Sequence, residues 1–150
     1  MNQLDMEVAG QKYRLRKMST KEQARVARKL LPFIKVIVPF VKIEGDQIIG
    51  TDNLTMEGLV QIVEPMSQII SDMPEKDWDL LVLTCMTTIT RLSGDRYAPV
   101  WNVQGDTPMF ADIELPQQLM LMGGALKFNL GPFMGVLHTL SPQAPPKANQ

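Results

Sequence analysis

Hydrophobic residues recur at spacings of three and four between Pro74 and Gly94, and this stretch is the clearest element of the chain. On an α-helix they form one stripe, which consists of Trp78, Leu81, Val82, Cys85, Met86, Ile89 and Leu92. Pro74 suits the first turn of a helix, and Gly94 is typical of a C-terminal stop. The pattern therefore predicts a helix from Pro74 to about Leu92 that needs other helices to cover it.

The N-terminal region predicts a hairpin followed by a helix. Hydrophobic and polar residues alternate on both sides of Gly10, which can take a positive φ, so we expect a β-hairpin over 6–16. Ser19 and Glu22 have the spacing of a capping box, which opens the next helix. The predicted buried face of this helix consists of Ala27, Leu30, Leu31 and Ile34. Pro32 should end or kink it.

The middle of the chain is less clearly patterned. Residues 36–49 fit either a second small hairpin around Glu44–Gln47 or a loop. A further helix is expected over 54–70, with a kink or break at Pro65.

The chain beyond the central helix predicts a long connection and a last helix. Glycine and prolines over 95–112 argue against regular structure there. The last helix should begin near Glu114 and stop at Gly131-Pro132. Within it, Gly123-Gly124 costs about 1 kcal/mol per residue relative to alanine, unless another backbone packs closely there. A kink and a packing site both remain open for this pair.

These elements predict the fold class. We expect residues 1–140 to form one mainly α domain of four or five helices with an N-terminal β-hairpin. Residues 141–150 are expected to form a disordered proline-rich tail. The length of 150 residues suffices for one hydrophobic core, and the 11 methionines suggest that this core is adaptable. No hydrophobic run is long enough to span a membrane, so we expect a soluble, cytoplasmic protein.

The charge of the chain is unevenly distributed. Residues 1–42 carry ten basic and three acidic side chains, a balance of +7, whereas residues 43–150 carry five basic and thirteen acidic, a balance of −8. Such asymmetry can indicate nucleic-acid binding, a solvated helix face, or a homo-oligomer in which the basic end meets the acidic end of a neighbour. Nucleic acid is disfavoured as a partner, because interleaved aromatic residues and a basic balance over the whole domain are both missing.

The residues for catalysis are scarce. The chain has one cysteine, Cys85, and one histidine, His138, and Cys85 lies on the predicted buried stripe, where a thiol is normally inert. Zinc sites draw on three or four such ligands, so no metal site is expected. Glu75 and Asp79 are explained by the preference of acidic residues for a helix N-terminus. We expect neither an enzyme nor a cofactor.

The order of several short motifs resembles the bacteriophage tail assembly chaperones of long-tailed phages and prophages. The motifs are Gln11–Lys17, Ser19–Gln23 with the basic helix after it, Asp77–Cys85, Tyr97–Trp101, Asp112–Pro116 and Phe128–Phe133. The resemblance spans about residues 6–134. It implies a small, mostly helical, non-enzymatic protein that binds the long tape measure protein and keeps it soluble until tail tube subunits polymerise around it. Such chaperones are typically absent from the finished virion, and many have a frameshifted long form whose extension recruits the tail tube protein.

A chaperone of this kind needs apolar side chains outside its own core. The candidates are Leu80 and Leu83 on the second face of the central helix, with Trp101, Phe128 and Phe133 from the segments nearest the motifs. Two leucines on such a face more commonly mean that the helix is covered on both sides within the core, and a docking surface is the alternative. The basic residues Arg25, Arg28 and Lys29 are expected to raise the encounter rate more than the affinity. The alternatives are a structural head–tail or minor tail component and a small DNA-binding regulator that uses the basic N-terminal region.

Overall fold

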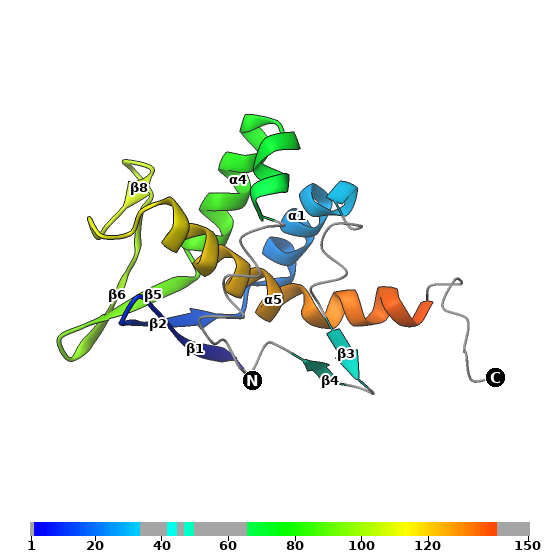
Figure 1. Ribbon diagram of the computed structural model, residues 1–150, viewed down its shortest axis with the longest axis horizontal. Helices are drawn as coiled ribbons and strands as arrows, with labels where there is room; N and C mark the ends of the chain where they lie inside the picture. The colour runs from blue at the N-terminus through cyan, green and yellow to red at the C-terminus, as the bar shows by residue number, and fades with distance from the viewer. Residues whose placement is uncertain (1, 34–41, 45–46, 50–65, 141–150) are drawn as a thin grey trace.

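The described chain forms a four-stranded antiparallel sheet with helices packed against one of its faces (Figure 1). The structure, a computed structural model, describes residues 2–33, 42–44, 47–49 and 66–140, and at 42–44, 47–49, 134–135 and 137–140 it describes the backbone alone. The strand order is β1-β2-β5-β6. The prediction of a mainly α domain is therefore wrong. The fold is mixed α/β, because one stretch predicted to be helical and another predicted to be irregular both contain strands.

The N-terminal hairpin is confirmed. It consists of β1 (Gln3–Val8) and β2 (Gln11–Arg16), which pair in antiparallel register. Ala9 and Gly10 form the two-residue turn with φ of 53° and 81°, the positive values that the favoured tight hairpin turns require. The residues that alternate onto the buried face are Met6, Val8, Tyr13 and Leu15.

The central helix is shorter than predicted. α4 spans Glu75–Met86, and the chain then turns at Thr87-Thr88 into β5 (Ile89–Ser93). The hydroxyl of Thr87 donates to the Leu83 carbonyl at 2.8 Å, which ties the turn to the last turn of the helix. A run of β-branched residues favours strand over helix, and the run here pairs with β2. Ile89 and Leu92 are therefore strand residues, and the helical stripe stops at Met86.

The connection over 95–112 is more regular than predicted. Gly94, with a φ of 70°, lies in the turn that leads from β5 to β6 (Arg96–Pro99) instead of ending a helix. Pro99 is tolerated because β6 is an edge strand of the sheet. A small separate hairpin follows, formed by β7 (Trp101–Asn102) and β8 (Thr107–Pro108).

The first helix, α1 (Thr20–Leu30), begins at the predicted capping box. The Ser19 hydroxyl accepts a hydrogen bond from the Glu22 amide at 3.1 Å, and the Glu22 carboxylate accepts one from the Ser19 amide at 2.8 Å. Pro32 ends the helix as predicted, in a 3-10 turn at Leu31–Phe33 (η1).

The predicted buried face of α1 is only partly right. Val26 and Leu30 are buried, Ala27 is half-buried and Leu31 is 44% exposed. Leu31 is the C-cap residue of α1, and the predicted stripe ends before it. The fourth predicted residue, Ile34, lies outside the described residues.

The middle segments are described only in part. Residues 66–72 are helical, with Met66 and Ile69 buried, and they match the end of the helix predicted over 54–70. The rest of that helix and its kink at Pro65 lie outside the described residues. Of the two readings of 36–49, the small hairpin is confirmed: β3 (Lys42–Glu44) pairs with β4 (Gln47–Ile49). The predicted disordered tail over 141–150 also lies outside the described residues.

The last helix, α5, runs without interruption from Leu115 to Leu140, so the predicted stop at Gly131-Pro132 is wrong. Of the two alternatives left open for Gly123-Gly124, a kink and a packing site, the structure shows a packing site at Gly124. A Cβ there would lie 2.8 Å from the Met6 sulfur and 3.6 Å from the Leu15 Cδ2, so glycine lets α5 approach the sheet closely.

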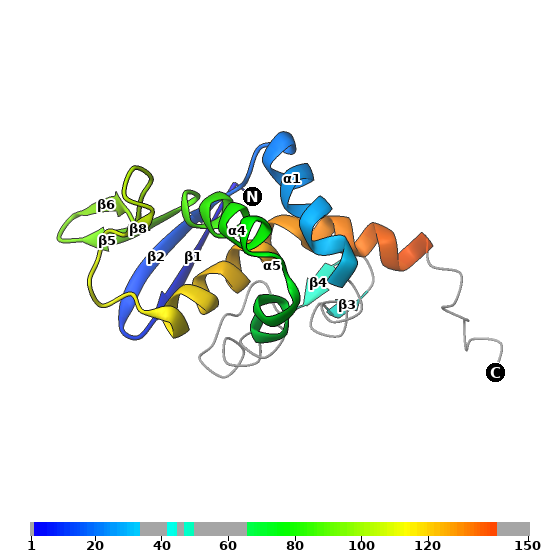
Figure 2. The ribbon, with the colours of Figure 1, turned by 90° about the horizontal axis from the view of Figure 1, so that it is seen from above.

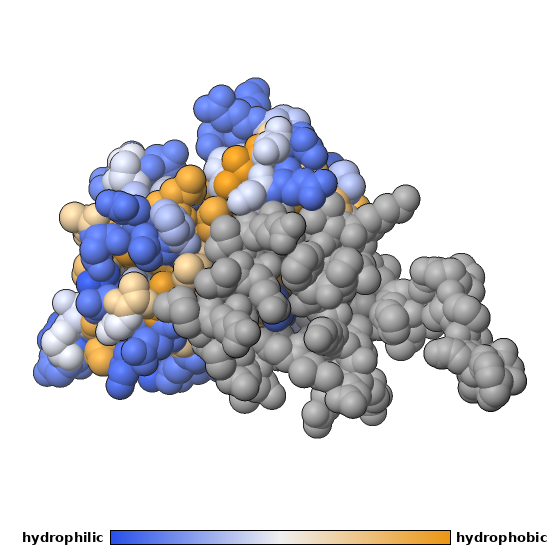
Figure 3. All heavy atoms as spheres, in the orientation of Figure 1, coloured by the Kyte–Doolittle hydropathy of each residue, from blue (hydrophilic) through white to orange (hydrophobic). Residues whose placement is uncertain are grey.

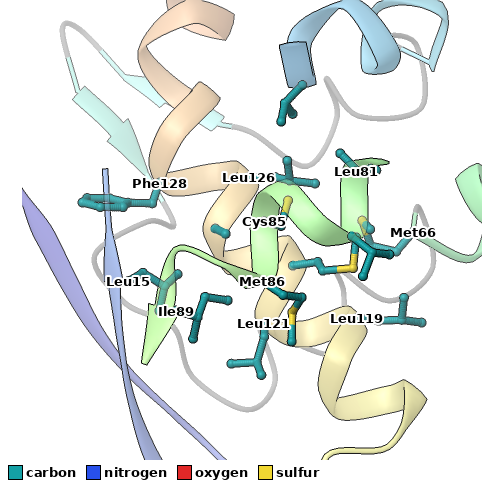
Figure 4. Packing of buried hydrophobic residues seen from close by; sticks show 14 of the residues in the cluster. Leu15, Met66, Leu81, Cys85, Met86, Ile89, Leu119, Leu121, Leu126 and Phe128 are labelled. Carbon is teal, nitrogen blue, oxygen red and sulfur yellow. The ribbon is translucent and has the colours of Figure 1, made fainter. Parts of the chain in front are cut away.

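The core lies where α5 passes between the sheet and the other helices. α5 contacts both β1 and α4, and α4 in turn contacts α1 (Figure 2). Figure 4 shows Cys85 and Met86 of α4, Leu121 and Leu126 of α5, and Ile89 of β5 gathered around one centre. Beyond Phe128, α5 continues away from the sheet (Figures 1 and 2).

Candidate partner-binding surface

The two leucines proposed on α4 have little free surface. Leu80 and Leu83 are both half-buried, and Leu83 packs against the core. Thr84 on the neighbouring face is buried as well, with its hydroxyl bonded to the Leu80 carbonyl at 2.8 Å. The middle of α4 is thus largely covered on both sides, which is the structural alternative that the sequence left open.

Two of the three predicted aromatic residues are core residues. Trp101 of β7 is 8% exposed and Phe128 of α5 is 7% exposed. Figure 4 shows Phe128 on the opposite side of α5 from Leu126. These two rings therefore expose little surface to a partner. The structure does not bring the five predicted residues together into one surface.

Phe133 is the predicted residue that the structure leaves exposed. Its exposed fraction is 38%, and Val136, one turn further along α5, is 55% exposed. Between Phe128 and Leu140 the sequence contains no Asp, Glu, Lys or Arg. We call residues 132–140 the apolar end of α5. An uncharged helical segment that exposes large apolar side chains is typical of an interaction site.

The basic residues of α1 differ in their surroundings. Arg28 is exposed and Arg25 is half-exposed, so both can act on an approaching partner. Lys29 instead forms an ion pair with Asp77 of α4, with 2.8 Å between Nζ and Oδ1. This pair joins α1 to α4. Lys29 therefore has a structural role in addition to the predicted role of attracting a partner.

The outer face of the sheet is charged and internally paired. Across β1 and β2, Asp5 lies opposite Arg14 and Glu7 opposite Lys12, and the Arg14 guanidinium donates to the Asp5 carboxylate at 2.9 Å. Arg14 also lies 4.1 Å from the centre of the Tyr97 ring. Figure 3 shows hydrophilic residues over much of the strand end of the molecule, with smaller separate apolar areas. This face is typical of a solvated sheet surface.

Arg91 of β5 makes several contacts that the sequence did not predict. Its side chain is 11% exposed, donates to the Asp112 carboxylate at 2.8 Å and lies 4.2 Å from the centre of the Phe110 ring. This hydrogen bond from Arg91 lowers the pKa of the Asp112 carboxyl. Burial raises the pKa of the neighbouring Tyr13 phenol, although the charge of Arg91 opposes the shift. These contacts tie the segment before α5 to the sheet, and only a strand assignment for 89–93 would have predicted them.

Near its middle, α5 is joined to the link between β2 and α1. The Lys17 ammonium donates to the Phe128 carbonyl at 2.5 Å and lies 4.2 Å from the centre of the Phe128 ring. Beside it, the buried Asn129 side chain accepts from the Met18 amide at 2.6 Å and donates to the Ala125 carbonyl at 2.9 Å. Residues far apart in sequence therefore meet about one helical turn before the apolar end of α5.

The described residues offer little for chemistry. Cys85 is fully buried, and burial raises the pKa of its thiol. His138 lies in α5, and its side chain is outside the described residues. Over the described ranges, no group of three or more His, Cys, Asp or Glu residues could hold a metal ion. Within those same ranges, no helix is both long enough and apolar enough to cross a membrane.

Comparison with known proteins identifies the family. The family model described as "Phage tail assembly chaperone protein, TAC" matches residues 9–141, which include β2, α1, α4 and α5. The chain belongs to this family. No curated protein and no solved structure matches the chain. The resemblance seen in the sequence is thus confirmed. The general role is that of a tail assembly chaperone, which acts with other tail proteins of a phage.

Proposed function

We propose that this tail assembly chaperone binds the tape measure protein, keeps it soluble and supports polymerisation of the tail tube around it. The proposal rests on the family and on one observation, the apolar end of α5 with its exposed Phe133 and Val136. We further propose that the protein is not an enzyme, acts in the host cytoplasm and is absent from the mature virion.

The chemistry of the apolar end suits a helical partner. A long, largely helical protein that is not yet assembled exposes apolar faces, and an uncharged helix can pack along such a face. Leu31, which is 44% exposed at the end of α1, adds apolar surface on a helix that contacts α5. A weak contact of this kind gains strength when many copies bind along one partner, because each bound copy raises the local concentration of the next.

The test is co-expression of the tape measure protein with the wild type and with Phe133→Asp and Val136→Asp variants. Val103→Asp is a matched control, because it makes the same change at a valine that is 60% exposed on the β7–β8 turn, compared with 55% for Val136. We expect both variants in α5 to leave the tape measure protein insoluble while Val103→Asp behaves as wild type. Equal solubility with all four proteins would contradict the proposal.

The same experiment separates the alternatives. Arg28→Glu should change solubility little, because an exposed charge is screened and contributes mainly to encounter. A DNA-binding regulator would instead bind DNA with an affinity that falls steeply as salt rises, and Arg28→Glu would weaken it. A structural tail component would be found in purified virions.

A further inference from the structure

α5 continues through a proline in its interior. A proline at position 132 lacks the N–H that would donate to the carbonyl of residue 128, and its ring presses against that carbonyl, which normally kinks or breaks a helix. Nevertheless the helix extends from Leu115 to Leu140 with Pro132 inside it. The Phe128 carbonyl is therefore the backbone acceptor that loses its helical donor.

Lys17 supplies a donor to this same carbonyl. Its Nζ lies 2.5 Å from the Phe128 oxygen and 4.2 Å from the centre of the Phe128 ring. The Lys17 ammonium is partly buried at this place, and this burial lowers its pKa. The Phe128 carbonyl and ring face offer the contacts that offset this loss.

The backbone of Lys17 is held on several sides. Its amide donates to the Asn2 carbonyl at 3.1 Å, and its carbonyl accepts from the Arg16 guanidinium at 3.0 Å. The next residue, Met18, is bound to Asn129 of α5. Because the backbone is held at Lys17 and at Met18, the Lys17 side chain reaches α5 from a defined position.

We propose that Lys17 is a positioning residue for the apolar end of α5: its ammonium replaces the missing amide of Pro132 at the Phe128 carbonyl, and so keeps residues 132–140 helical and directed away from the body. The importance of this arrangement for partner binding rests on the proposed function. A pre-formed helix binds more tightly than one that must order on binding, because less conformational entropy is lost.

The test is a double-mutant cycle between Lys17 and Pro132, read by hydrogen exchange of the backbone amides of 133–140. Lys17→Met keeps the apolar stem and removes the ammonium, and Pro132→Ala restores an amide that can donate to the Phe128 carbonyl. We expect Lys17→Met to speed exchange at 133–140 by about ten- to hundred-fold, the factor for a hydrogen bond to a charged group. In the Pro132→Ala background the same change should have an effect of less than about threefold.

Lys17→Arg is the conservative control, and it should retain most of the protection because it keeps a cationic donor. If Lys17→Met speeds exchange equally in the wild-type and Pro132→Ala backgrounds, the ammonium does not replace the amide and the proposal fails. It also fails if exchange at 115–127 rises as much as at 133–140, since Lys17 would then stabilise the whole fold.

Binding to the tape measure protein is measured on the same proteins to separate the two proposals. We expect Lys17→Met to weaken binding about tenfold and Lys17→Met with Pro132→Ala to recover most of it. If the cycle in hydrogen exchange is as expected but the wild type does not bind the tape measure protein, the proposed function fails while the role of Lys17 stands. If the wild type binds and Lys17→Met binds equally well despite faster exchange, the apolar end of α5 is not positioned for binding by Lys17.

Discussion

The two halves of α5 are held in different ways. Residues 115–127 lie in the core between the sheet and α4, with Leu121, Met122 and Ala125 fully buried. Phe128 and Leu130 are still buried, and the helix is bonded there to the link between β2 and α1, whereas Phe133 and Val136 further along are exposed. The helix is thus packed in the core as far as Leu130, and its last part exposes apolar side chains at Phe133 and Val136. Under the proposed function, this separation keeps the apolar end of α5 out of the core and within reach of a partner.

The largest expected effect contrasts these halves directly. Leu121→Ala should lower the free energy of unfolding by about 2–5 kcal/mol, because it leaves a cavity at a fully buried position. Val136→Ala should change it by less than about 0.5 kcal/mol, as is usual at exposed positions. Urea denaturation measures both. Similar losses for the two variants would show that the apolar end is part of the core.

A second prediction concerns Leu83, which is half-buried and packs against the core. Leu83→Asp should cost about 2 kcal/mol or more, because a charge replaces an apolar contact. The measurement is again urea denaturation, followed by tape measure binding of the folded fraction. A variant with unchanged stability that no longer binds would instead place Leu83 in the binding surface, as the sequence first suggested.

Gly124 tests how closely the first half of α5 must approach the sheet. Alanine gains about 1 kcal/mol in helix propensity, but its Cβ would lie 2.8 Å from the Met6 sulfur. Overpacking typically costs about 1–3 kcal/mol, so we expect a net loss of about 1 kcal/mol in thermal denaturation. In a Met6→Ala background, where the flexible side chain is gone, Gly124→Ala should become neutral or stabilising. A gain in the wild-type background would mean that Met6 moves away without cost.

The smallest expected effect is at the capping box of α1. Burial by itself would raise the pKa of the Glu22 carboxyl, but hydrogen bonds from Arg16 and from the Ser19 amide outweigh it, and the pKa lies below its ordinary value. A lowered folded-state pKa stabilises the fold above the unfolded value of about 4.3, and this is lost as the pH falls through the folded pKa. We expect a loss of less than about 1 kcal/mol between pH 5 and 3.

Glu22→Gln is the control for this pH dependence. Its amide oxygen can still accept from the Ser19 amide but does not titrate, so the stability of this variant should fall less between the same two pH values. An identical pH profile for the variant and the wild type would assign the acid loss to other carboxylates, such as Asp112 beside Arg91.

Local patterns were reliable where the signal and its cause lie within a few residues. The hairpin around Gly10 and the capping box at Ser19 depend on turn geometry and on adjacent hydrogen bonds, and both were predicted. The end of α4 was missed, because the apolar period of three and four continues by chance through Ile89 and Leu92. Pairing with β2 decided that segment, and a partner strand about seventy-five residues earlier cannot be detected in a local helical pattern.

The candidate partner-binding residues were likewise predicted only in part. Exposure of Phe133 followed from the sequence as one of five apolar candidates, but the burial of Trp101 and Phe128 did not, because both depend on which elements cover them. The roles of Arg91 and Lys17 were also hidden, since each acts on a residue that is distant in sequence.

By itself, the sequence determined the family, the first hairpin, the caps of α1 and the apolar, uncharged character of residues 128–140. These follow from the order of residues and from contacts within one turn of chain. Only the tertiary structure decided that residues 87–93 leave the helix for the sheet and that α5 passes through Pro132. The physical reason is that both features involve bonds to the N-terminal region: β5 pairs with β2, and Lys17 donates to the Phe128 carbonyl, whose helical donor is missing at Pro132.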